Sequence, residues 1–347
     1  MVRRRRQERP DWGTDEPSLP ARDLVDQHLL LVPSTVGVEE VDYLIRARLP
    51  GCDLAGTGEV RLGRHSRITG PYTLTMEGAV DADVPMPWTV CYALQAPAER
   101  EGPAAPGTDD RDGFASAFPA GLPWRDEGRA LQLLVALARR LGGAVRTAGS
   151  LEVIQPDPDR AVDHTVHSPY WLDPEVLLGV VSRVVPGAYL DLAVLPWHGP
   201  SDDVYSGLLP GAETEAHRLP SAQLEALHAA ADEDDLDTLA GPAVLDGYAV
   251  VAPLDPHGMV QVGVLAGDPD DPAVAGESWI DRPFVSYEVR WLCPDPRDRE
   301  RRGPSEDYLI ARSRVFPLVS AIARAVVEAA SGLVTDEDGF WLDRYGL

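Results

Sequence analysis

Two stretches of this chain align with each other, and this repeat constrains the fold more than any other feature. Residues 28–54, HLLLVPSTVGVEEVDYLIRARLPGCDL, match residues 164–190, HTVHSPYWLDPEVLLGVVSRVVPGAYL, without a gap. Both stretches begin with histidine, and both end in a Pro-Gly pair, two further residues and a leucine. Similarity at a fixed spacing indicates that one local structure is formed twice. We interpret it as an internal duplication.

Each copy has the pattern of a short strand, a turn, a helix and a stop. In the first copy Val38, Val41 and Ile45 recur at helical spacing, which predicts one apolar helix face. In the second copy Asp173-Pro174 is a typical helix start, because aspartate caps the helix and proline suits its first position. The Pro-Gly pair is expected to end the helix in both copies.

The similarity continues beyond the aligned stretches. WTVCYALQAP (88–97) and VSYEVRWLCP (285–294) alternate apolar and polar residues, which predicts strands with Trp88 and Trp291 on their inner faces. Amphipathic helices are expected next, around residues 133–143 and 319–332. A pair of strands should follow each helix, and Asp338-Gly339 is a strong hairpin signal in the second pair.

Earlier strand-like segments complete each half. They cover residues 59–63 and 72–78 in the first half, and 248–254 and 259–267 in the second. The expected fold is α+β, with two related tandem α/β-sandwich domains, each roughly β-α-β-β-β-α-β(β) with a mostly antiparallel sheet. The predicted boundaries are a disordered tail at 1–20, a first domain at 21–158, and a second at 159–347 with an insert at 199–245.

The composition excludes several kinds of chemistry. All 31 basic residues are arginine, and the chain has neither lysine nor asparagine. A pyridoxal Schiff base and a Walker phosphate loop both need lysine, so neither is expected. Cys52, Cys91 and Cys293 are far apart and form no CxxC pair, which favours a reducing cytoplasm over a disulfide framework. No apolar run approaches the length of a membrane span, so none is predicted.

The negative charge is concentrated in the second half. The chain has a net charge of −25, and residues 161–347, with 12 arginines and 32 carboxylates, account for −20 of it. Such a surface repels phosphate backbones, so nucleic acid is not an expected partner. It attracts basic surfaces and accelerates encounter with them. We expect a protein partner with a basic surface.

The segment DHTVHSPYWL (163–172) raises the question of a metal site. His164 and His167 are three apart on a predicted strand, so their side chains should point to opposite faces. A metal would then need other ligands, such as Asp163, His198 or His257. No spacing in the chain matches a zinc site, so we expect no metal and no cofactor.

Aromatic residues at the ends of elements are the best candidates for binding. Trp171 follows the first strand of the second copy, and Trp197-His198 precedes the insert, where Asp202 and Asp203 follow. Apolar anchors surrounded by charge are typical of protein interfaces. The sequence favours a non-catalytic binding protein. The alternatives are an enzyme, such as a hydrolase, and a small-ligand binding module, either with its site where the halves meet.

Overall fold

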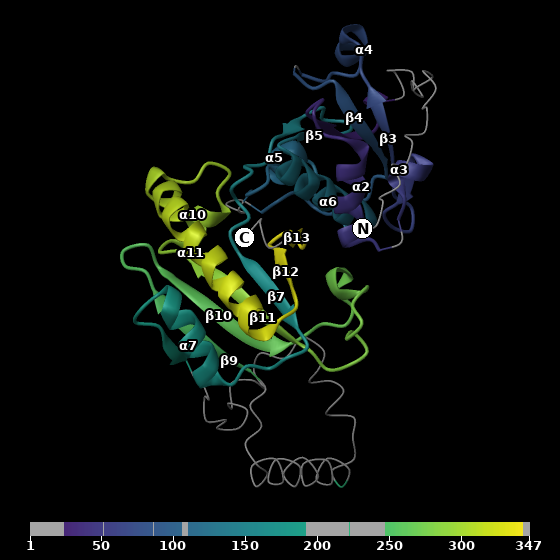
Figure 1. Cartoon of the computed structure of the whole chain (residues 1–347). Helices are drawn as coiled ribbons and strands as arrows, with labels where there is room; N and C mark the ends of the chain where they lie inside the picture. Colours follow the sequence, from purple (N-terminus) through teal and green to yellow (C-terminus); the bar gives the residue numbers. More distant parts are fainter. Residues whose placement is uncertain are drawn as a thin grey trace, which may run out of the picture.

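The computed structural model has two antiparallel sheets, one from each half of the chain (Figure 1). The α+β class with mostly antiparallel strands is therefore confirmed. The predicted tail at 1–20 lies outside the described residues, as does the predicted insert at 199–245 except for Ala222. None of the described helices has the length and apolar character needed to cross a membrane. The structure describes residues 24–50, 52–85, 87–105, 110–191, 222 and 247–342.

The first sheet has the strand order β2-β3-β4-β1-β5-β6. Helices α2 and α6 cover one of its faces, and α4 lies with a second apolar cluster on the other. The elements of this half are β1 (His28–Val32), α2 (Val38–Arg48), α3 (Leu54–Thr57), β2 (Glu59–Arg61), β3 (Arg67–Thr73), α4 (Met76–Asp81), β4 (Val90–Gln95), α5 (Phe114–Ala117), α6 (Arg125–Leu141), β5 (Ala144–Arg146) and β6 (Val153–Ile154).

The second sheet has the strand order β13-β12-β7-β11-β10-β9-β8. Its elements are β7 (His164–Ser168), α7 (Pro174–Val184), β8 (Tyr189–Asp191), β9 (Tyr248–Pro253), β10 (Met259–Ala266), η1 (Pro272–Val274), β11 (Val285–Leu292), α10 (Pro296–Glu300), α11 (Glu306–Ala330), β12 (Leu333–Asp336) and β13 (Trp341–Leu342). When β8 is set aside, the two sheets follow the same order: β1 and β7 occupy the same place, and so do β4 and β11.

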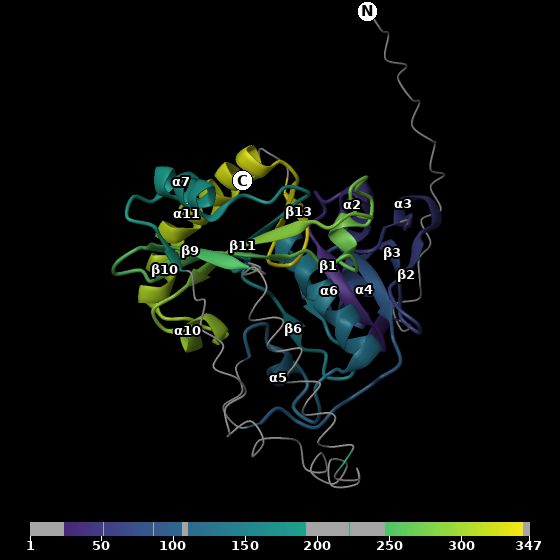
Figure 2. The same cartoon turned by 90° about the horizontal axis from the view of Figure 1, so that it is seen from below.

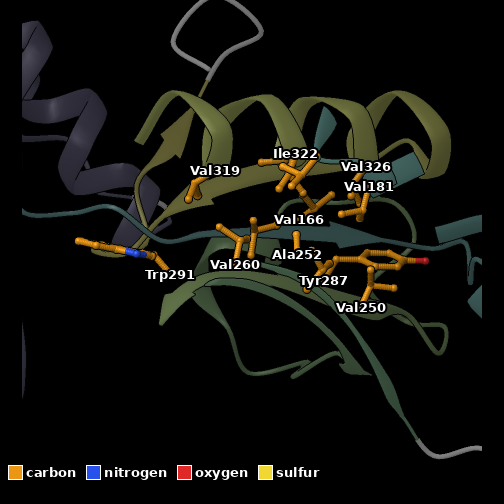
Figure 3. Packing of buried hydrophobic residues seen from close by; sticks show 14 of the residues in the cluster. Val166, Val181, Val250, Ala252, Val260, Tyr287, Trp291, Val319, Ile322 and Val326 are labelled. Carbon is orange, nitrogen blue, oxygen red and sulfur yellow. The ribbon is translucent and has the colours of Figure 1, made fainter. Parts of the chain in front are cut away.

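Each half has a core between its sheet and its two longer helices. In the second half, Val166 and Tyr287 of the sheet belong to one cluster with Ile322 and Val326 of α11 (Figure 3). Trp291 packs against Tyr308 of the same helix, with 5.1 Å between ring centroids. The predicted alternation of β11 is correct, because Val289 joins the same cluster while Arg290 is exposed. These residues are buried because β-branched and aromatic side chains on alternate positions share one face of a strand.

Trp88 does not lie on the predicted inner face of β4. It precedes the strand, which begins at Val90, and packs with Leu29 and Leu31 on the face that α2 and α6 do not cover. Val90, Tyr92 and Leu94 do share the helix-covered face, as predicted. The first half therefore has apolar residues on both faces of its sheet.

The two halves meet at the turn between β12 and β13, which lies against the first half in both views (Figures 1 and 2). Phe340 is 0% exposed and belongs to the core cluster of the first half. Trp341 packs against Tyr43 of α2, with 6.3 Å between ring centroids. Arg48 of α2 donates a hydrogen bond of 2.8 Å to the carbonyl oxygen of Asp338. The second half thus supplies part of the first half's core.

Candidate functional site

His28 and His164 begin equivalent strands, and both point to the helix-covered face. Nδ1 of His28 accepts a hydrogen bond from the amide of Ala148 at 2.9 Å, so Nε2 carries the proton and donates to Glu127 at 3.1 Å. In His164 the arrangement is reversed. Nδ1 donates to the carbonyl oxygen of Asp163 at 2.9 Å, and Nε2 accepts from the hydroxyl of Ser320 at 3.1 Å. Burial lowers the pKa of both imidazoles. Both histidines are therefore neutral and internally satisfied.

His167 points to the opposite face from His164, as predicted. Its Nδ1 lies 3.2 Å from the hydroxyl of Ser286, and its Nε2 lies 3.4 Å from that of Thr335. Burial lowers the pKa of this imidazole too. Within the described ranges, no group of three or more His, Cys, Asp or Glu side chains is placed to hold a metal ion. The expectation of no bound zinc stays a prediction.

The three cysteines are thiols rather than activated nucleophiles. Burial raises the pKa of Cys91 to about 12, and it also raises the pKa values of Cys52 and Cys293. The thiolate is the reactive form of cysteine, so a raised pKa lowers reactivity. At neutral pH these thiols are therefore protonated and weakly nucleophilic.

The loop between β7 and α7 presents two exposed aromatic side chains. Tyr170 is 62% exposed and Trp171 is 39% exposed. The ring of Trp171 meets that of Tyr248 edge to face, with 5.3 Å between centroids. Val176, also exposed, follows on the first turn of α7, and the exposed carboxylates of Asp173 and Glu175 lie between. Apolar side chains and negative charge thus occur together on this surface. We call the segment between β7 and α7 the Tyr170–Trp171 loop.

Two buried tyrosines hold this loop from below. The hydroxyl of Tyr287, on β11, donates to the carbonyl oxygen of Tyr170 at 2.7 Å and accepts from the amide of Leu172 at 2.8 Å. The hydroxyl of Tyr248, on β9, donates to the carbonyl oxygen of Leu172. Burial raises the pKa values of both phenols, so they remain protonated donors at neutral pH. The backbone of the loop is therefore fixed by hydrogen bonds from the sheet below it.

A serine completes the support of the loop. The hydroxyl of Ser168 accepts a hydrogen bond from the amide of Tyr170 at 3.0 Å and donates to the carbonyl oxygen of Ala330 at 2.7 Å. The corresponding turn of the first half, after β1, carries Ser34 and Thr35 in place of the aromatic pair. Of these two equivalent turns, only the one in the second half carries the aromatic pair.

The structure places only part of the predicted site. Trp171 is exposed at an element end, where the sequence predicted it. Trp197, His198, Asp202 and Asp203 lie outside the described residues, so their proximity to Trp171 stays a prediction. Tyr170 was missed, although its position beside Trp171 in SPYWLDP was the available signal. No family model matches this chain, and no characterised protein or solved structure is significantly similar to it.

Proposed function

We propose that this chain is a non-catalytic binding protein that recognises another protein through the Tyr170–Trp171 loop. The observation that carries the proposal is the pair of buried hydroxyls, of Tyr287 and Tyr248, that fix the loop while Tyr170 and Trp171 stay exposed. Exposed aromatics on a rigid backbone lose little conformational entropy on binding, and such residues dominate interface energies. The internal partners of His28, His164 and His167 also favour binding over catalysis.

The proposed partner has a basic surface and meets the chain in the cytoplasm. Asp173 and Glu175 flank the exposed aromatics, and the second half of the chain has most of the negative charge. Charges at the rim of an interface mainly steer association and make it dependent on salt. Partner recovery should therefore fall as the ionic strength rises.

A pull-down tests the binding proposal. Full-length chain is immobilised as the wild type, as Trp171→Ala and as Trp124→Ala, a matched control because Trp124 is 50% exposed on the first half. We expect the wild type and Trp124→Ala to recover the same basic protein and Trp171→Ala to lose it. Equal recovery by all three would contradict the role of the loop.

A deletion of residues 200–243 separately tests the insert, whose loss should abolish partner recovery.

We also propose that the two halves are duplicated domains, with boundaries at 21–158 and 159–347. The support is the shared strand order, with β1 and β7 in the same place, and the aligned segments that contain them. An experimental structure with different strand orders in the two halves would contradict this proposal.

The enzyme alternative has one observation in its favour. Ser320 and His164 form a hydroxyl–imidazole pair, and His164 lines a cavity of about 320 Å³ between the halves, together with Arg139 and Arg140. Ser320 itself is only 6% exposed and does not line that cavity. A nucleophile must reach its substrate, so we expect no labelling of Ser320 by a fluorophosphonate probe. Labelling that disappears in Ser320→Ala would favour the hydrolase.

A further inference from the structure

The first half contains a cavity of about 900 Å³ that the proposed function does not use. Its lining comes from β2 and β3, from the end of β4 and the residues after it, and from His28 at the start of β1. Within the sheet, β2 is the edge strand on the side away from the second half (Figure 2). Arg61, Arg64 and Arg67 of the β2–β3 hairpin and Arg100 beyond β4 all line the cavity. We propose that this cavity binds a small molecule that bears a phosphate group.

Two arginines of the hairpin, Arg61 and Arg64, are available to a ligand. Arg100 contacts the buried carboxylate of Glu127, and Arg67 pairs with Glu59 at 3.6 Å. Arg61 and Arg64 form no ion pair with any residue in the described part of the chain, and both are exposed. Arg61 donates a side-chain hydrogen bond of 2.8 Å to the carbonyl oxygen of Arg64. Two guanidinium groups therefore face the cavity without a carboxylate partner.

Asp126 fixes the turn that carries these arginines. It lies in the first turn of α6 and accepts hydrogen bonds from the amides of Arg64, at 3.2 Å, and His65, at 2.8 Å. Burial alone would raise the pKa of Asp126, but the hydrogen bonds to this turn, together with the Ser66 hydroxyl and the nearby Arg129, lower it below its usual value. The carboxylate is therefore charged at neutral pH and holds the turn in place. Arginines on a fixed turn are preorganised to receive an anion.

The rest of the cavity indicates an organic ligand of limited size. Leu94, Ala96, Pro97 and Ala98 form an apolar wall beside the arginines. Sites for small molecules typically have volumes of about 300–1,000 Å³ and combine apolar walls with a few polar groups. Guanidinium groups match phosphate oxygens in geometry and can bind them with two hydrogen bonds each. The ligand would place its phosphate at the hairpin and its apolar part at this wall.

The charge of the whole chain favours a compact anion over a nucleic acid. With a net charge of −25, the chain repels an extended polyanion that runs past the cavity onto the surrounding surface. A compact ligand is exposed mainly to charges within the Debye length, about 8 Å at physiological ionic strength. Within the cavity, four arginines face three carboxylates: Asp26, Glu59 and Glu127.

The second half lacks the same arrangement at the corresponding place. Its turn between β9 and β10 carries Asp255, Pro256 and His257, and the cavity of about 550 Å³ beside it is lined by Asp295, Asp298 and Asp307 with one arginine, Arg301. Among the described residues, only the first half thus has a cluster of arginines at this position.

Calorimetric titration of the full chain at low salt tests the proposal, with pyrophosphate, inorganic phosphate, citrate and a DNA duplex as probes. We expect pyrophosphate to bind most tightly. Arg61→Ala/Arg64→Ala should weaken it roughly tenfold or more, because a hydrogen bond to a charged group contributes at least that factor. Arg61→Lys/Arg64→Lys, which keeps both charges, should weaken it less. The matched control is Arg183→Ala on α7, an exposed arginine of the second half that should leave binding unchanged.

Four outcomes would overturn the proposal. They are no binding of pyrophosphate at millimolar concentration, equal binding by the Arg61→Ala/Arg64→Ala and wild-type chains, tighter binding of citrate, and tighter binding of the duplex. The variant residues are exposed, so both double variants should fold. Unfolding curves that match the wild type check this. If the alanine variant does not fold, the lysine variant and the probe series still decide the question.

Discussion

Arg139 of α6 and Asp338 of the β12–β13 turn form an ion pair between the two halves, with 2.5 Å from Nη1 to each carboxylate oxygen. Asp112 accepts a further hydrogen bond from Arg139 at 2.6 Å. The arginine side chain is 5% exposed. Burial alone would lower the pKa of Arg139, but the two carboxylates raise it, so the guanidinium stays charged. The contact between the halves thus depends on a buried charge.

Removal of Asp338 should destabilise the chain substantially. Asp338→Ala leaves the buried guanidinium of Arg139 with one carboxylate, and loss of a partner from a buried pair costs about 3–5 kcal/mol. Urea unfolding measures the change. The control is Glu59→Ala, which breaks a pair with Arg67 in which both side chains are 51% exposed. That substitution should cost less than about 1 kcal/mol, and equal costs for both variants would show that the buried pair has no special role.

Phe340→Ala should destabilise the first half, although Phe340 belongs to the second. Truncation of a fully buried phenylalanine costs about 3–5 kcal/mol. Hydrogen exchange should accelerate in β1 and α6, which contribute to the same core cluster. Phe316→Ala, at a site that is 39% exposed, is the control and should cost far less. Faster exchange confined to α7 and α11 in Phe340→Ala would refute this assignment.

Tyr287→Phe should loosen the Tyr170–Trp171 loop. The loss of one hydroxyl leaves the carbonyl oxygen of Tyr170 and the amide of Leu172 without this partner, at a cost of about 1–3 kcal/mol. Faster hydrogen exchange at Leu172 is the measurement. Tyr92→Phe is the matched control, since the buried hydroxyl of Tyr92 has no hydrogen-bond partner in the part of the chain that the structure describes. It should be neutral, and a similar cost there would mean that the loop is held by other contacts.

His28 should make the chain less stable in acid. Burial, together with Arg100 and Arg146, lowers the pKa of His28 to about 4 from an unfolded value of 6.5, although Glu127 is close. A lowered pKa means that the unfolded state binds the proton more tightly. The stabilisation is therefore present above pH 6.5 and is lost as the pH falls through about 4. The loss is about 3 kcal/mol over this range.

The comparison of His28→Gln with wild type isolates this effect. The decrease in unfolding free energy between pH 6.5 and 4 should shrink by about 3 kcal/mol in the variant. His65→Gln, at an exposed position, should keep the wild-type pH profile. An unchanged profile in His28→Gln would show that other groups cause the acid sensitivity.

Local sequence patterns predicted helices and strands well where one face of the helix or strand is buried. Pro174 does begin α7 and Asp173 occupies its N-cap position, but the Asp173 side chain makes no capping hydrogen bond, so that part of the prediction was wrong. The helix predicted from Val38 spans Val38–Arg48. A strand predicted at 72–78 was wrong in its second part. β3 ends at Thr73, and Thr75 caps α4 by accepting a hydrogen bond from the amide of Gly78. A helix as short as α4 has too few residues to show a helical period. The alternation of apolar and polar residues at 72–78 therefore led to the prediction of a strand.

The hydrophobic pattern of the two later strands is compatible with Tyr92 being equivalent either to Tyr287 or to Val289. In the structure Tyr92 pairs with Leu30 and Tyr287 pairs with Val166, so the two tyrosines occupy equivalent places. A shift of two residues keeps every side chain on the same face, so the hydrophobic pattern does not distinguish the two registers. Only the pairing with the neighbouring strand does.

The candidate site was predictable only at its surface. Trp171 was identified because it is an aromatic residue at the end of an element. The support by Tyr287 and Tyr248 was not identified, because those residues lie more than 70 positions away and follow an ordinary strand pattern. Phe340 was missed for the same reason: its apolar character indicates burial, but local sequence does not indicate in which core.

The position of Phe340 affects the order in which the chain can fold during synthesis. The last strand of the first half ends at Ile154, yet the core of that half is closed by a side chain made almost 190 residues later. At about 5–20 residues per second, the ribosome needs roughly 10–40 s to cover that distance. A nascent first half must therefore wait with an apolar gap open to solvent. Chaperones that bind exposed apolar surface would encounter it during this interval, before the second half arrives to close the gap.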